Sequence, residues 1–277
     1  MILMERFRWM DLTSRQFKRY ILEGGDLAAL PVGSMEVMGP HLPVGIKMFI
    51  ARAIAEEICK IHEGLCLPVV PLSPITGDKE HGGVSLDTNV ALSYLRDVVC
   101  EAHENAIRRM LLVGSFDEIY YVSAEIFQEY DIPLTHIDPM NLPLFEDMGV
   151  HERFNAIAAG SLRLLGEDEL LTKMLEASKK CIAKGGYKAP DEAAPIKNLL
   201  KVVETDWISG VFPHFYKNDE YKVLPTENIC PDSAAEAIRN WILDKEGALD
   251  ALSKYAGVFP RTRYDRGLRM GGIGFAE

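Results

Sequence analysis

The sequence predicts an α/β protein in which a mostly parallel sheet is covered by helices on both faces. Four short apolar runs, residues 26–33, 65–73, 110–115 and 132–138, are typical of buried strands. Longer segments with helical periodicity separate these runs. Because strands that alternate with helices form right-handed βαβ units, the strands are expected to lie parallel in one sheet.

Local signals define each element in turn. The first expected helix, DLTSRQFKRYILEGG, has Asp11 or Thr13 as its cap and a Gly-Gly pair at its end. A second helix, residues 47–63, repeats apolar residues at helical spacing. Prolines weaken the strand expected at 65–73, because proline has no amide hydrogen to donate to a sheet. A third helix, residues 88–109, starts at a Thr88 or Asp87 cap, and a fourth covers 119–130.

The second half of the chain is rich in helices, and no internal repeat or low-complexity linker separates it from the first half. The helices expected there are 151–165, 167–184, 192–204 and 232–255. The segment KGGYKAPDEAAP, residues 184–195, is a candidate boundary but is interpreted as a loop. We therefore expect one domain over residues 1–277.

Composition excludes several classes of function. A net charge of −11 argues against a nucleic-acid or anionic-membrane partner. No run approaches the roughly 18 apolar residues of a membrane span, and Glu5 and Arg6 interrupt the N-terminal apolar run, unlike in a signal peptide. The five scattered cysteines contain no CxxC pair, which predicts reduced thiols in the cytoplasm. GxSxG, P-loop and GxGxxG motifs are absent from the sequence.

In parallel sheets, ligands bind outside the carboxyl ends of the strands. The loops expected at that edge are 33–46, 73–87, 114–118 and 138–150. They carry the polar side chains that we expect to contact a small-molecule substrate, namely His41, Glu80, His81, Ser115 and Asp117.

Four segments together resemble the creatininase (creatinine amidohydrolase) family. LPVGSMEVMGPHLPVG, residues 30–45, is similar to the family signature LPVGSxEQHGPHLPLGTD. GGVSLDTNVALSYLRDVV (82–99) resembles the PGTxSLD segment, and RRMLLVGSFDEI (108–119) resembles the strand that ends in NGHxEN. AAGSLRLL (158–165) is weakly similar to the helix containing ETSLML. The resemblance is clearest over residues 8–165 and implies a three-layer fold, often assembled as a hexamer.

The resemblance also implies a dinuclear Zn or Mn site that hydrolyses small amides, cyclic amides or formamides. Two such ions polarise a carbonyl and supply hydroxide at neutral pH. The first Glu of the signature is Glu36, but its His is Met38 and the Asp that bridges both metals is Lys47. In the NGHxEN segment the His falls on Phe116, while the Glu is retained as Glu118.

Other matches are also incomplete. The Pro-His of the signature is present as Pro40-His41, but the family's Glu-His pair falls near Arg153 and Phe154, with His151-Glu152 two residues away. The sequence is therefore interpreted as a divergent member with a degraded metal site.

Lys47 decides how the site is interpreted, because a protonated ammonium cannot ligate a metal and repels one. We expect its ammonium to occupy the place of the metals between Glu36 and Glu118, with Met38 and Phe116 filling the space of two imidazoles. In one alternative, Lys47 reaches solvent and the two carboxylates are hydrated. In another, Zn or Mn binds a rearranged site.

The candidate ligands of that rearranged site are Glu36, His41 and Glu118, with the Glu80-His81 loop as a further source. Two functions follow. The first is a non-catalytic, ligand-binding subunit or an enzyme without metal, in which Glu36, Lys47 and Glu118 are the catalytic candidates. The alternative is an active amidohydrolase acting on C–N bonds at the rearranged site.

The expected partners are a small-molecule ligand and other protein chains. A homo-oligomer follows from the resemblance, and a hetero-oligomer with an intact homologue would supply the missing ligands. The divergent C-terminal stretch, residues 258–277, has four arginines, Arg261, Arg263, Arg266 and Arg269. It is either a solvated tail or an arm that binds an acidic patch of a neighbouring subunit or an anionic ligand.

Overall fold

The computed structural model describes residues 7–36, 38, 41–75, 82–115, 119–130, 132, 134–139, 142–148, 150–183 and 229–258. The helix expected at 192–204, the loop expected at 184–195 and the arginine-rich tail lie outside these residues.

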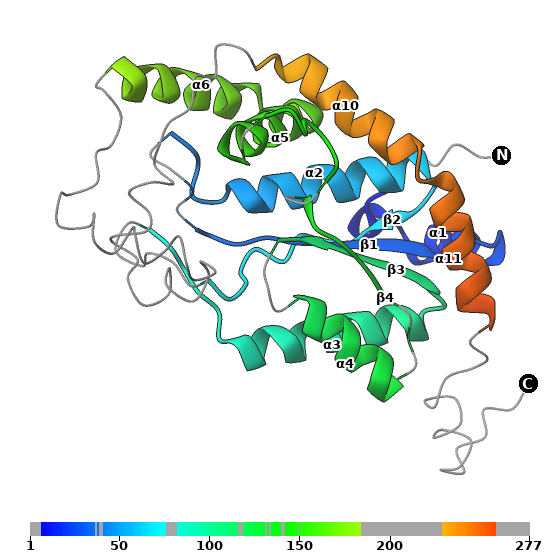
Figure 1. Ribbon diagram of the computed structural model, residues 1–277. Coiled ribbons are helices and arrows are strands. Elements are labelled where there is room, and N and C mark those ends of the chain that lie inside the picture. The colour runs from blue at the N-terminus through cyan, green and yellow to red at the C-terminus, as the bar shows by residue number, and fades with distance from the viewer. Residues whose placement is uncertain are drawn as a thin grey trace, which may run out of the picture.

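The centre of the molecule is a parallel four-stranded sheet (Figure 1). Its strands are β1 (Leu27–Val32), β2 (Leu65–Cys66), β3 (Arg109–Gly114) and β4 (Leu134–Ile137), in the spatial order β2-β1-β3-β4. β1 is central and pairs with β3 in a register that places Leu27 opposite Arg109 and Val32 opposite Gly114. The α/β class and the parallel sheet predicted from the sequence are confirmed.

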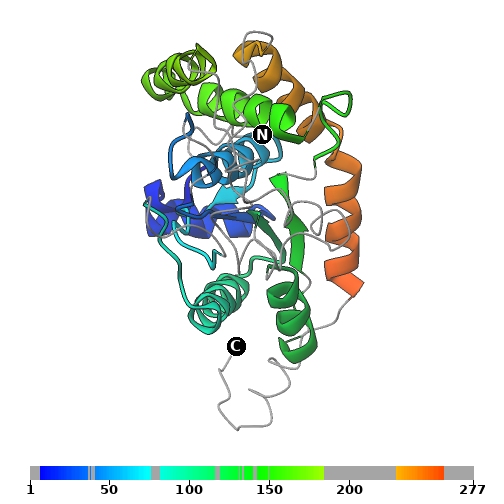
Figure 2. The same ribbon diagram turned by 60° about the vertical axis from the view of Figure 1, so that its left-hand side comes forward.

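Helices cover both faces of this sheet, which makes three layers (Figures 1 and 2). On one face α2 (Ile46–Ile61) lies directly on the strands, and α5 (Val150–Leu165), α6 (Asp168–Ala183) and α10 (Pro231–Leu243) pack beyond it. The opposite face carries α3 (Thr88–Glu104) and α4 (Ile119–Tyr130). The remaining elements are a 3-10 turn at Trp9–Asp11, α1 (Ser14–Leu22) and α11 (Glu246–Val258). In the described part of the chain, no helix is both long and apolar enough to cross a membrane.

The two faces of the sheet form two apolar cores because side chains alternate along each strand. In β1, Leu27 and Ala29 pack on the α2 side, whereas Ala28 and Leu30 pack with residues of α3 and α4. All six residues of β1 are buried. This burial on both faces explains why the strand reads as a continuous apolar run.

The largest differences from the sequence prediction concern three elements. The strand expected at 65–73 pairs regularly only over Leu65–Cys66, because the prolines that follow cannot donate to the ladder. The helix expected to reach residue 109 ends at Glu104, where the next residues turn through a positive φ of 67° at Ala106. The helix expected at 232–255 is two helices, and the turn between α10 and α11 brings Leu249 into the core.

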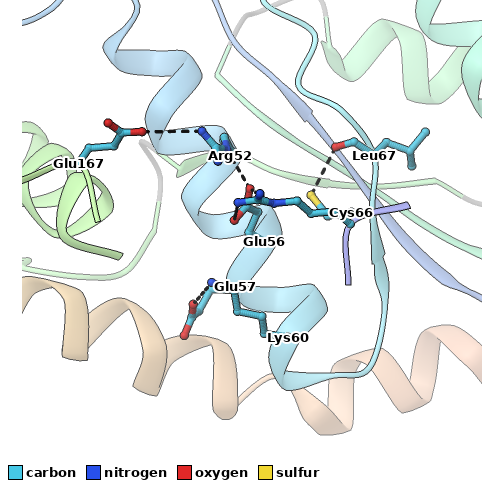
Figure 3. A network of polar contacts seen from close by, with 8 residues as sticks. Arg52, Glu56, Glu57, Lys60, Cys66, Leu67 and Glu167 are labelled. Carbon is cyan, nitrogen blue, oxygen red and sulfur yellow. Dashed lines mark hydrogen bonds and ion pairs between the residues drawn. The ribbon is translucent and has the colours of Figure 1, made fainter. Parts of the chain in front are cut away.

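Two adjacent glutamates, Glu56 and Glu57, are buried on α2 and join distant segments through ion pairs (Figure 3). Glu56 accepts from Arg8 at 3.1 Å and from Arg52 at 2.8 Å. Glu57 accepts from Arg239 of α10 at 2.7 Å. Burial alone would raise the pKa of Glu56, but hydrogen bonds from Arg8 and Arg52 outweigh it and hold the pKa below its usual value.

This cluster predicts a loss of stability in acid. Since the folded pKa of Glu56 is lowered, its ion pairs stabilise the protein above the ordinary value of 4.5, and the stabilisation disappears as pH falls through the lower folded value. Glu56→Gln should lower the free energy of unfolding at pH 7 by about 1–3 kcal/mol, since hydrogen bonds to charged groups contribute that much.

Urea unfolding at pH 7 and pH 4 measures this effect. Glu169→Gln is the matched control, because Glu169 pairs with Lys173 on the exposed surface of α6. Equal losses of unfolding free energy in the two variants at pH 7 would show that the buried cluster contributes no more than an exposed ion pair.

Candidate functional site

Polar side chains follow three of the four strands at their carboxyl ends. Ser34 and Glu36 come after β1, Ser115 comes directly after β3, and Asp138 comes directly after β4. The strands are parallel, so these residues lie at one edge of the sheet. The start of α2, which carries Lys47, lies at the same edge because α2 follows the loop that leaves β1.

Lys47 and Glu36 form a short ion pair at this edge. The Lys47 Nζ donates to Glu36 Oε2 at 2.7 Å, and the two side chains are only 18% and 16% exposed. Ser34 Oγ also donates to Glu36 Oε2, at 3.5 Å. The backbone N–H of Glu36 donates to the carbonyl of Val44 at 2.9 Å, which holds the loop next to the helix. The contact that the sequence predicts between these two residues is therefore present.

A close approach of backbone segments sets this geometry. A Cβ added to Gly33 would lie 2.4 Å from Met48 Cα, so a residue with a side chain cannot occupy that position without movement. The start of α2 consequently packs directly against the end of β1. Lys47 is in the first turn of α2, where no side-chain cap is present and the helix dipole disfavours a cation by about 0.3–1 kcal/mol. The Glu36 carboxylate offsets this repulsion.

His41 is buried and connects the β1–α2 loop to α5. Its Nε2 lies 2.8 Å from Asn155 Oδ1, and both residues are almost fully buried. Burial lowers the pKa of His41 from its usual value, although the hydrogen bond to Asn155 opposes this shift. The neutral ring then donates from Nε2 to the amide oxygen, and the Nδ1 atom is buried with no hydrogen-bond partner.

The ends of β3 and β4 are joined by a second pair. Ser115 Oγ donates to Asp138 Oδ1 at 2.5 Å. One residue pair deeper in the sheet, the His136 Nε2–H donates to the carbonyl of Gly114 at 2.8 Å. These contacts fix Asp138 beside Ser115 at the carboxyl ends of the two strands.

Several predicted site residues lie outside the described part of the chain, namely Glu80, His81, Phe116, Asp117 and Glu118. The proposed contact between Lys47 and Glu118 is therefore untested. Met38 is partly buried and packs against the core on the α2 side, as an apolar replacement for an imidazole would.

Two residues of this edge were not recognised from the sequence. Asp138 had a usable signal, because it follows the last apolar strand as Ser115 follows the one before. Asn155 had none, since it is one polar residue within the buried run of α5 from Phe154 to Leu162.

The described residues contain no group of three or more His, Cys, Asp or Glu side chains that could hold a metal ion. The Lys47 ammonium lies 2.7 Å from the Glu36 carboxylate. His41 forms its hydrogen bond with the amide of Asn155 and not with another potential metal ligand. Among the described residues this donor set is too small for a dinuclear centre. It can bind and orient polar groups, or donate a proton from Lys47.

Comparisons with known proteins agree on one family. The sequence matches the creatininase profile, described as creatinine amidohydrolase, over residues 10–153. A crystal structure of creatinine amidohydrolase (creatininase) is 15% identical and superposes with a TM-score of 0.60 over 93% of this chain and 99% of that one. A structure named "Creatininase Mn" is 14% identical, with a TM-score of 0.58 over 93% and 100%.

A point mutant of creatininase aligns over 52% of this chain and 62% of its own length, at 16% identity and a TM-score of 0.46. No curated protein matches the chain. The two superpositions that span more than nine-tenths of both chains confirm the three-layer fold expected from the sequence.

A double-mutant cycle measures the Lys47–Glu36 pair. Lys47→Met should lower the free energy of unfolding by about 1–3 kcal/mol, because it leaves a largely buried carboxylate without its cation. Adding Glu36→Gln should cost less than it does alone, with a coupling energy of about 1–2 kcal/mol. If chemical unfolding gives a coupling energy near zero, each group is stabilised by water and not by the other group.

Gly33→Ala should move the start of α2 away from β1. We expect a loss of about 1–3 kcal/mol in the free energy of unfolding, typical of overpacking. Gly247→Ala is the matched control, because its added Cβ meets no atom within 4 Å and its helix should gain up to ~1 kcal/mol. If thermal unfolding shows the two variants equally stable, the close approach at Gly33 is not a constraint.

Proposed function

The chain belongs to the creatininase family, and we propose that it has lost the dinuclear amidohydrolase centre and binds a small-molecule ligand at the same edge of the sheet without metal. The chain is then a ligand-binding subunit or an enzyme whose chemistry needs no metal. This proposal goes beyond family membership, which by itself implies a metal-dependent hydrolase.

The observation that carries the proposal is the Lys47–Glu36 ion pair, 2.7 Å long and largely buried. By resemblance, Lys47 stands where the family has the Asp that bridges both metals. Removing two divalent ions would leave the Glu36 carboxylate without a cation in a poorly solvated place. The ammonium supplies that cation, and a metal brought to the same oxygen would meet its repulsion.

Without metal, the residues at this edge can still bind and polarise a ligand. Lys47 can donate a hydrogen bond or a proton to a developing negative charge, with Glu36 holding its ammonium in place. Asp138, oriented by Ser115, can accept from an N–H or O–H group of the ligand. These roles explain why polar groups remain at the edge after loss of the metal ligands.

A rearranged mononuclear site is the second candidate, and the unpartnered Nδ1 of His41 supports it. A neutral imidazole with a free lone pair is a good ligand for zinc. Glu36 and Glu118 would be the remaining ligands, so Lys47 would have to leave Glu36. The chain would then be an active amidohydrolase.

Metal content separates the two candidates. Purified, unchelated protein should contain close to zero Zn, Mn or Fe per chain by inductively coupled plasma mass spectrometry, and it should not hydrolyse creatinine. About one metal per chain that is lost in His41→Ala would support the rearranged site. Two per chain would contradict the proposal outright.

The variant Lys47→Asp with Met38→His is the matched comparison, because it restores two side chains of the family signature. It should bind more metal than the wild-type chain if loss of these ligands is what removed the centre. Equal metal content in both proteins would indicate that other residues control metal binding.

A further inference from the structure

One exposed stripe of α3 combines carboxylates with apolar side chains. Residues that are three or four positions apart lie on the same face of a helix. From the C-terminal end of α3 toward its start, the exposed residues at this spacing are Glu104, Glu101, Asp97, Tyr94 and Val90. Tyr94 and Val90 are 51% and 54% exposed, which leaves apolar surface open to water. The stripe is therefore acidic at one end and apolar at the other.

The acidic end of this stripe lacks cations. Glu101 and Glu104 lie in the last turn of α3, where the helix dipole disfavours a carboxylate. In the part of the chain that the structure describes, neither carboxylate forms an ion pair. Arg108, which follows the helix, donates to the backbone carbonyl of His103 at 2.7 Å. A cation brought to the two glutamates would therefore be stabilised by both carboxylates and by the helix end.

The negative charge of the acidic end also affects a neighbouring thiol. Burial raises the pKa of Cys100 first, and the charge of Asp97 raises it further. Arg96 opposes this rise, whereas Glu104 and Glu101 add to it. The carboxylates thus act together on one place of the α3 surface.

α11, the helix that precedes the arginine-rich tail, lies near this acidic end. α3 leads directly into β3, and Arg109, the first residue of β3, donates to the carbonyl of Leu249 in α11 at 3.5 Å. α11 ends at Val258, on the side of the molecule that carries α4 (Figures 1 and 2). Residues 259–277 follow, and an extended chain of that length spans about 60 Å. This is more than the length of α3, which is about 25 Å.

We propose that residues 259–277, the part of the arginine-rich tail after α11, dock along this stripe of the same chain. The order of charged and apolar residues matches. Along the tail the arginines come first and apolar residues follow, namely Arg261, Arg263, Arg266 and Arg269 and then Met270, Ile273 and Phe275. Along the stripe, from the end near α11, the carboxylates come first and Tyr94 and Val90 follow. Guanidinium groups would then pair with the carboxylates, and apolar side chains would cover each other.

Docking within one chain is favoured over docking between chains. A tethered segment that can span the distance meets its site at an effective concentration of about a millimolar. Two chains that each carry a net charge of −11 repel one another instead. The inference goes beyond the proposed function and does not depend on it, because the acidic end of α3 leads into the start of β3, whereas the candidate ligand site lies at the carboxyl ends of the strands.

Carboxylate footprinting of the full-length chain tests the docking. Glycine ethyl ester, coupled by a carbodiimide, labels exposed carboxylates, and mass spectrometry gives the labelling rate of each one. In a variant with all four arginines of the tail replaced by glutamine, Glu101 and Glu104 should be labelled about threefold faster or more than in the wild type. A tail that is docked in about two-thirds of the molecules slows labelling by that factor. Glu176, an exposed carboxylate of α6 on the other side of the sheet, is the internal control and should react equally in both proteins.

Trypsin reports the same contact from the side of the tail, because it cleaves after arginine. Glu101→Gln combined with Glu104→Gln should speed cleavage of the tail about threefold or more, since cleavage follows the undocked population when docking is fast. Glu176→Gln is the matched control variant and should keep the wild-type rate. Glutamine has a helix propensity close to that of glutamate, so both variants should fold.

Unchanged labelling of Glu101 and Glu104 in the arginine variant, or unchanged cleavage in the glutamate variant, overturns the inference. Co-expression with the wild-type chain distinguishes docking on a neighbouring subunit. Isotope-labelled chains of the arginine variant should keep their fast carboxylate labelling in the presence of wild-type chains. If wild-type chains protect them, the tail docks between chains and the proposal of docking within one chain is wrong.

Discussion

The ion pair between Lys47 and Glu36 is the interaction on which the chemistry of this edge depends. It forms because β1 and α2 meet without a gap at Gly33 and Met48, which brings the first turn of the helix to the end of the strand. A cation in that turn is unfavourable by itself, and a carboxylate with little water around it is also unfavourable. Each charge stabilises the other, and the ammonium would repel a metal ion brought to the same carboxylate.

The scaffold behind the pair is stabilised separately. Two apolar cores enclose the sheet, and the buried glutamates of α2 connect the N-terminal segment and α10 to the same helix. α2 therefore carries structural charges in its second half and the candidate functional charge in its first turn. This separation would let residues at the first turn of α2 change while the fold stayed recognisable at about one residue in seven identical.

The candidate site combines groups with and without partners. Lys47 pairs with Glu36 and Ser115 pairs with Asp138, whereas the Nδ1 of His41 is buried without a hydrogen-bond partner. Native proteins leave few such groups, and each requires an explanation. A lone pair on a neutral imidazole can ligate a metal ion, so metal analysis tests whether His41 has that role.

Sequence alone determined the α/β class, the parallel strands and the family, because apolar runs, caps and the signature around Glu36 are local features that survive divergence. It also predicted that Lys47 would pair with Glu36, since charge balance demands a partner for both. Only the tertiary structure showed that Asn155 holds His41 and that the Nε of Arg153 is buried without a hydrogen-bond partner. These facts depend on contacts between segments more than 100 residues apart or on which groups lack a partner in space, and no local pattern records either.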